Sequence, residues 1–178
     1  MSESALHAVV AYGEEAKREI NDTVTRIGTV RRVFEGSIRA ARTIGIDGVF
    51  ESLTAEYKQV TDAYLHFWNI GATLGQLGIT ADQVKRADST ADAAALMGDM
   101  GERLTGLVEL SATAIGQLEE ALRNIVFIMS QIEHRDSGAR LVEETASALH
   151  VATEVRDGLV QILAQHGIVV TAIEELDE

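Results

Sequence analysis

The sequence contains no cysteine and no proline among its 178 residues. The lack of cysteine excludes disulfides, thiolate metal sites and cysteine nucleophiles. The lack of proline removes the residue that most often breaks helices. Aromatic residues make up only 4% of the chain, and its apolar content is mostly Ala, Leu, Ile and Val. This composition is typical of helices that pack on other helices, so we expect an all-α fold.

A basic surface is also missing, because the formal net charge is −13 and only residues 1–43 carry a slight positive excess. This balance argues against nucleic-acid binding. The N-terminus does not resemble a signal peptide, and the apolar run at 125–132 is far shorter than the roughly 20 residues of a membrane span. We expect a soluble cytoplasmic protein, with secretion that uses no cleavable signal peptide as the alternative.

Hydrophobic residues recur every three or four positions along most of the chain, which predicts long helices. Gly45 and the pair Asp47-Gly48 interrupt the first run, and the sequence around Ser137 predicts another tight turn. The chain is therefore expected to be one domain, an elongated antiparallel four-helix bundle with coiled-coil-like heptad packing. The expected helices cover about 3–43, 48–76, 90–133 and 138–174, with a linker at 78–89.

The second predicted helix has the clearest heptad pattern. Its two apolar rows are Phe50, Tyr57, Tyr64 and Gly71 in one, and Leu53, Val60, Phe67 and Leu74 in the other. Such rows are the a and d positions that face another helix. In the linker, Thr80 and Gln83 predict a capping box, and either Ser89 or Thr90 is expected to be the N-cap of the third helix.

The same helix holds an unusual group of aromatic residues and glycines. Glycine inside a helix costs about 1 kcal/mol relative to alanine, so two glycines on one face suggest that close contact with another backbone is required. Two arginines of the first helix, Arg32 and Arg39, could guide a charged partner to this region. The predicted interaction surface is Tyr64, Phe67, Trp68, Gly71, Gly75, Arg32 and Arg39.

No set of residues predicts catalysis. The five histidines are scattered along the chain, and no Glu-x-x-His pair of a di-iron bundle occurs. His150 and Glu154 lie one helical turn apart, but two ligands of common types are a weak metal signal. We therefore expect no enzyme activity, no cofactor and no metal site.

The segment FWNIG, within long alanine-rich helices, resembles the small helical proteins of actinobacterial type VII secretion, which carry a Trp-x-Gly turn between two helices. The resemblance covers residues 67–71. Two residues separate Trp68 from Gly71 here, and both lie within a predicted helix. No acidic residue follows four positions after Tyr12, Tyr57 or Tyr64, where that family carries its export signal. The resemblance therefore implies no functional residue.

The leading hypothesis is a non-enzymatic interaction or scaffold protein that associates with itself or with a protein partner through apolar helix faces. One alternative is a ligand-binding or sensory bundle with a pocket near Tyr57, Tyr64 and Trp68. Another is a helical substrate of a type VII-like export system. The heptads are compatible with closure within one chain or between chains.

Overall fold

The structure, a computed structural model, describes residues 2–131 and 135–167. It confirms the predicted fold class, since four long helices form an antiparallel bundle. The helices are α1 (Glu3–Ile44), α2 (Asp47–Lys85), α3 (Thr90–Ser130) and α4 (Arg135–Gln165). Each helix packs against two others, because contacts join α1 to α2, α2 to α3, α3 to α4 and α4 back to α1.

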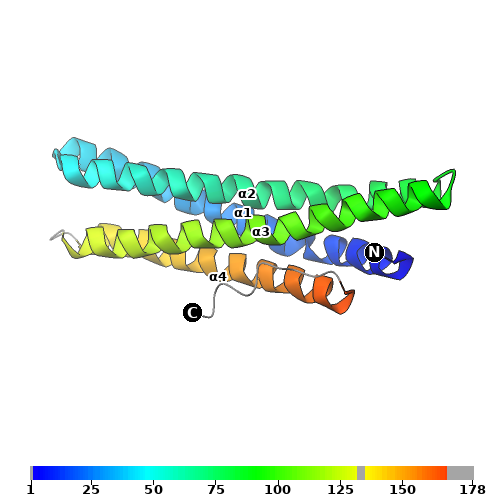
Figure 1. Cartoon of the computed structure of the whole chain (residues 1–178). Helices are drawn as coiled ribbons and strands as arrows, with labels where there is room; N and C mark the ends of the chain where they lie inside the picture. The colour runs from blue at the N-terminus through cyan, green and yellow to red at the C-terminus, as the bar shows by residue number, and fades with distance from the viewer. Residues whose placement is uncertain (1, 132–134, 168–178) are drawn as a thin grey trace.

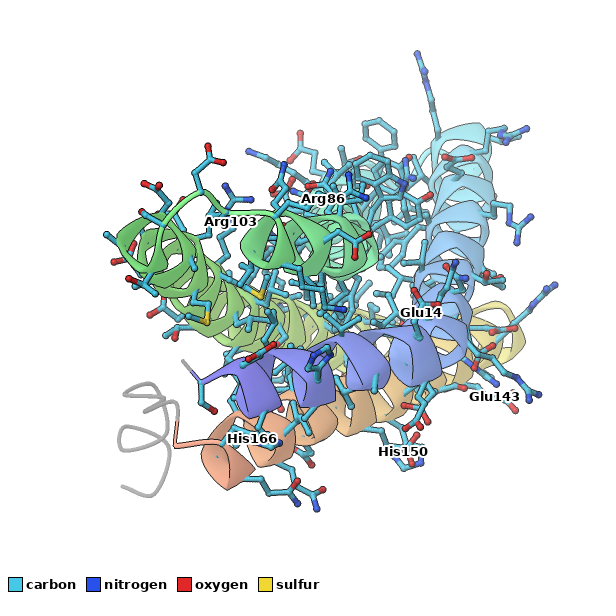
Figure 2. All side chains as sticks on the ribbon, turned by 90° about the vertical axis from the view of Figure 1, so that its right-hand side faces the viewer. Glu14, Arg86, Arg103, Glu143, His150 and His166 are labelled. Carbon is cyan, nitrogen blue, oxygen red and sulfur yellow. The ribbon has the colours of Figure 1, made fainter. Side chains whose placement is uncertain are left out.

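The bundle is elongated, with the α2–α3 turn and the start of α1 at one end and the α1–α2 turn at the other (Figure 1). Figure 2 looks onto the first of these ends and shows α1 lying across α4, with α2 beside α3. The arrangement places one side of α1 against α2 and another side against α4. The two sides of α1 therefore border different surfaces of the molecule.

The turns follow the local chemistry of the sequence, with several differences from the prediction. Gly45 ends α1 in the left-handed conformation, with φ of 79°, and its N–H donates to the carbonyl of Ala41 at 3.1 Å. The Ser89 hydroxyl accepts from the backbone N–H of Asp92 at 3.1 Å, so Ser89 is the cap of α3, and Thr90 is the first residue of the helix.

The predicted connections between α2 and α3 and between α3 and α4 both differ from those in the structure. Helix α2 continues to Lys85, which reduces the predicted 78–89 linker to residues 86–89. Thr80 is not a cap, because its hydroxyl donates to the carbonyl of Gln76 within the same helix at 3.4 Å. Helix α4 begins at Arg135 rather than after the predicted turn around Ser137, and it ends at Gln165 rather than at 174. The rest of that predicted span, from residue 168, lies outside the described residues.

The core closes within one chain and includes buried residues from all four helices. In α2, the row that ends in Leu74 is buried as predicted, but the row of Phe50, Tyr57, Tyr64 and Gly71 is only half-buried. The second core row is instead Glu56, Ala63, Ile70 and Leu77. The prediction missed this row because a charged residue occupies its first position.

Glu56 is buried between α2 and α3. The side-chain amide of Asn124 on α3 donates to its Oε1 at 2.9 Å. Its Oε2 is buried without a hydrogen-bond partner among the described residues. Burial raises the pKa of Glu56, the Asn124 hydrogen bond lowers it, and the charge of Glu120 raises it further. Glu56 is thus the one charged side chain buried in the described core, and one of its two oxygens has a hydrogen-bond partner there.

Tyr12 on α1 fixes the contact with α4. Its hydroxyl is buried without a hydrogen-bond partner in the described parts of the chain, and burial, with a smaller contribution from Glu19, raises the pKa of Tyr12 to about 12. A Cβ atom added to Gly158 would lie 2.6 Å from this hydroxyl oxygen. The glycine is thus required so that the tyrosine can lie between the two helices.

We expect Tyr12 and Gly158 to be coupled in a double-mutant cycle. Gly158→Ala should destabilise the native protein, because the new methyl group clashes with the hydroxyl. In a Tyr12→Phe background the next atom is 3.4 Å away, so the same change should stabilise the helix by up to about 1 kcal/mol. Urea denaturation of the four proteins gives the coupling, expected at about 1–2 kcal/mol.

Gly116→Ala is the matched control for this cycle, because a Cβ at Gly116 meets no described atom within 4 Å. It should stabilise both backgrounds equally. An effect of Gly158→Ala that is the same with Tyr12 and with Phe at that position would contradict the assigned contact.

Candidate interaction surface

Phe67 and Trp68 are adjacent in sequence but have opposite environments. Phe67 is fully buried in the core, whereas Trp68 is 58% exposed. The separation follows from helix geometry, because successive residues point about 100° apart around the axis. The predicted aromatic cluster is therefore divided between the core and the outer surface of α2.

Trp68 lies at the edge of an open groove of about 220 Å³ between α1 and α2, which we call the α1–α2 groove. Its lining is mostly apolar, with polar residues of α1 at the rim. The residues are Gly13, Glu14, Lys17, Ile20, Asn21, Val24, Phe67, Trp68, Gly71, Ala72, Leu74 and Gly75. Figure 2 shows Glu14 on α1, which directly follows Gly13, the first residue of that helix to line the groove.

Three glycines line the groove, Gly13, Gly71 and Gly75, and they differ in how closely other atoms approach them. A Cβ at Gly71 would lie 3.1 Å from Cγ2 of Ile20 on α1, which is tighter than an ordinary contact. At Gly13 the nearest atoms would be the Leu74 carbonyl oxygen at 3.5 Å and the Leu77 side chain at 3.6 Å. Gly75 differs, because an added Cβ would meet no described atom within 4 Å. Gly71 therefore allows the close approach of α1 and α2, an alanine at position 13 would make only ordinary contacts, and Gly75 leaves an uncovered surface.

Tyr64 and Tyr57 do not line this groove. The guanidinium of Arg31 on α1 lies 4.9 Å from the ring centre of Tyr64 and 5.8 Å from that of Tyr57. The Tyr57 hydroxyl donates to Glu35 at 2.8 Å. These contacts join α1 to α2 along the edge of their interface. The role of Tyr64 in the structure is therefore a contact between helices.

Arg32 and Arg39 are exposed, and the structure does not bring them to Trp68. Arg32 donates to the Thr29 hydroxyl at 3.0 Å and lines a different groove, which also includes Arg140 of α4. Neither arginine lines the α1–α2 groove. The prediction grouped them with Trp68 because the sequence does not show which side of α1 faces α4.

Helix α2 also carries an exposed apolar row on the side away from the core, which was not predicted from the sequence. Leu65, Trp68 and Ile79 are 51%, 58% and 63% exposed, and Ala72 and Gly75 between them are exposed as well. These five residues, the outer stripe of α2, repeat at intervals of three and four. The sequence contained a signal for them, because residues 63–81 form its longest stretch without Asp, Glu, Lys or Arg.

The described residues do not assemble a metal centre, since no group of three His, Cys, Asp or Glu side chains lies close enough to hold an ion. His150 and Glu154 do approach, with Nε2 and Oε1 3.6 Å apart, but both side chains are mostly exposed. Figure 2 shows His150 on the outer side of α4. This pair is a surface contact between neighbouring turns of one helix.

Comparison of the chain with protein-family models, with curated protein sequences and with solved structures gave no match. None of the helices in the described ranges is both long and apolar enough to span a lipid bilayer. The function must therefore be inferred from the surface itself.

Proposed function

We propose that this protein is a non-enzymatic helical interaction protein that binds a protein partner through the outer stripe of α2 and the adjacent α1–α2 groove. The observation that carries the proposal is Trp68, a large apolar side chain that is 58% exposed on an uncharged segment of a protein with a net charge of −13. Tryptophan is enriched among the residues that dominate the energy of protein interfaces. Exposing it in water has a cost that a partner would remove.

The size of the groove favours a protein side chain over a small-molecule ligand. Ligand pockets usually enclose about 300–1,000 Å³, whereas the α1–α2 groove holds about 220 Å³ and is open to solvent. A single apolar side chain of a partner helix fits such a volume. Tyr57, which the ligand-binding hypothesis requires, contacts Arg31 and does not line the groove.

The test is photo-crosslinking in the organism that makes the protein. A benzoylphenylalanine residue at position 68 should form a covalent adduct of defined mass with its partner. The matched control is the same residue at position 127, because Phe127 on α3 is also aromatic and is 67% exposed. We expect an adduct from position 68 only. No adduct at position 68, or equal adducts from both positions, would contradict the proposed function.

A further inference from the structure

Resting on the proposed function, we infer that the occupant of this surface is a second copy of the same chain, bound through an antiparallel contact between the two α2 helices. Charge restricts where two copies of this chain can meet. Two copies that each carry −13 repel one another, and the repulsion is weakest where the contacting surfaces lack charge. Residues 63–81 offer an exposed helix face with no Asp, Glu, Lys or Arg.

The spacing of the outer stripe fits contact with another helix. Leu65, Trp68, Ala72, Gly75 and Ile79 occupy alternate a and d positions of a heptad, which is the pattern that packs against another helix. The core of the bundle is formed by the opposite rows of α2. The stripe is therefore a complete heptad face that no other described helix covers.

Four residues of the outer stripe, Trp68, Ala72, Gly75 and Ile79, can also pair with the same four residues of a second copy. In an antiparallel pair, each a residue lies opposite a d residue of the partner. With the two-fold axis between residues 73 and 74, Trp68 faces Ile79 of the partner subunit, and Ala72 faces Gly75 of the partner subunit. Small residues then meet at the centre, where Gly75 leaves the surface open, and large residues meet on both sides. Leu65 lies beyond these pairs, at the edge of the contact, opposite the exposed Asp82 of the partner subunit. A two-fold interface requires this kind of match.

The polar residues beside the stripe also match. Asn69 and Gln76 are exposed on the flank of α2. In the same register, Asn69 and Gln76 of the partner subunit flank the stripe on the same side, offset by about two residues along the helix axis, and the two amide groups can hydrogen-bond. A contact between single helix faces belongs to the small interface class, so the dimer should dissociate on dilution.

Sedimentation velocity of the full chain over a wide concentration range tests the inference. We expect reversible dimers, and Trp68→Glu should weaken them at least 100-fold. Gly75→Glu is a second variant that protects against loss of folding, because glutamate favours helices more than glycine does and a Cβ there meets no described atom. It should also abolish dimers while circular dichroism remains unchanged.

The register is tested by crosslinking, which the lack of native cysteine makes specific. Asn69→Cys and Gln76→Cys chains, mixed and treated with a short bis-maleimide, should give crosslinked heterodimers. Asn69→Cys alone should crosslink much less, because its two copies would lie nine residues apart along the axis, or about 13.5 Å. Glu109→Cys on the exposed surface of α3 is the control and should give none. Efficient crosslinking of Asn69→Cys with itself would overturn the inferred register.

A monomer at every concentration, or dimers that persist in both glutamate variants, would overturn the inference that a second copy is the occupant. The proposed function would survive a monomer if photo-crosslinking from position 68 gave an adduct with a different protein. It would fail together with the inference if position 68 gave no adduct. The two failures are therefore distinguishable.

Discussion

Phe67→Ala is expected to lower the free energy of unfolding by about 3–5 kcal/mol, the usual cost of removing a buried phenylalanine. Phe67 is fully buried, so alanine would leave a cavity between α2 and the rest of the core. Trp68→Ala, one residue further along, should change the free energy of unfolding by less than about 1 kcal/mol, because exposed positions tolerate substitution. Urea denaturation followed by circular dichroism measures both values.

This comparison must be made at a protein concentration where the chain is monomeric, so that loss of association does not contribute. Alanine is a good helix former, and both substitutions keep α2 helical. Similar losses from the two variants would mean that Trp68 is part of the core, which would contradict the division of the aromatic cluster.

The second large effect is expected at the buried carboxyl group. Asn124→Ala should destabilise the protein by about 1.5–3 kcal/mol at neutral pH, because it removes the described hydrogen-bond donor to a buried carboxylate. The deficit should depend on pH. Asn124 lowers the pKa of Glu56, so its removal raises that pKa further and favours the protonated form.

The sign follows from linkage. Burial raises the pKa of Glu56 above the value of about 4.5 in the unfolded chain. Its contribution to stability is therefore fully present below that pH and is lost as the pH rises through the pKa of the folded state. The deficit of Asn124→Ala should shrink toward about 1 kcal/mol, the value of a neutral hydrogen bond, as the pH is lowered.

Glu56→Gln provides the control for this prediction, because it keeps the shape of the side chain and removes the charge. In that background, Asn124→Ala should cost the same at every pH. Differences between paired variants cancel the titration of the other carboxyl groups. A deficit that is independent of pH in the native background would contradict the prediction that the Asn124 hydrogen bond lowers the pKa of Glu56.

The sequence was sufficient to predict the fold class, because hydrophobic periodicity reports directly on helices that pack together. It was not sufficient to identify the second core row of α2. Leu53, Val60, Phe67 and Leu74 can pair with the row on either side, and the aromatic residues at 57 and 64 favoured the wrong one. Glu56 occupies a core position that charge alone would assign to solvent.

The structure brings together only part of the predicted interaction surface. Trp68, Gly71 and Gly75 line the α1–α2 groove. Trp68 is exposed because the core rows of α2 are those of Phe67 and Ile70, and the row of Tyr64, which the sequence favoured, is not one of them. Arg32 and Arg39 belong to another part of the surface, because α1 faces two neighbours. The outer stripe could have been found by combining the uncharged stretch at 63–81 with a heptad count.

The heptads left open whether the helices pack together within one chain or between chains. The main apolar rows of the four helices meet in one core, so the bundle closes within one chain. The outer stripe remains on the surface of α2. Self-association would therefore be a property of a folded monomer, and it does not require exchange of helices between chains.

The fluorescence of Trp68 tests the central claim most directly, because Trp68 is the single tryptophan of the chain. Acrylamide quenching should be efficient in dilute protein, as expected for an indole that is 58% exposed. As the protein concentration is raised, or as the photo-crosslinked partner is added, quenching should fall and the emission should shift to shorter wavelength. A Trp68 that remains equally accessible under all these conditions would contradict the claim that the outer stripe of α2 is an interaction surface.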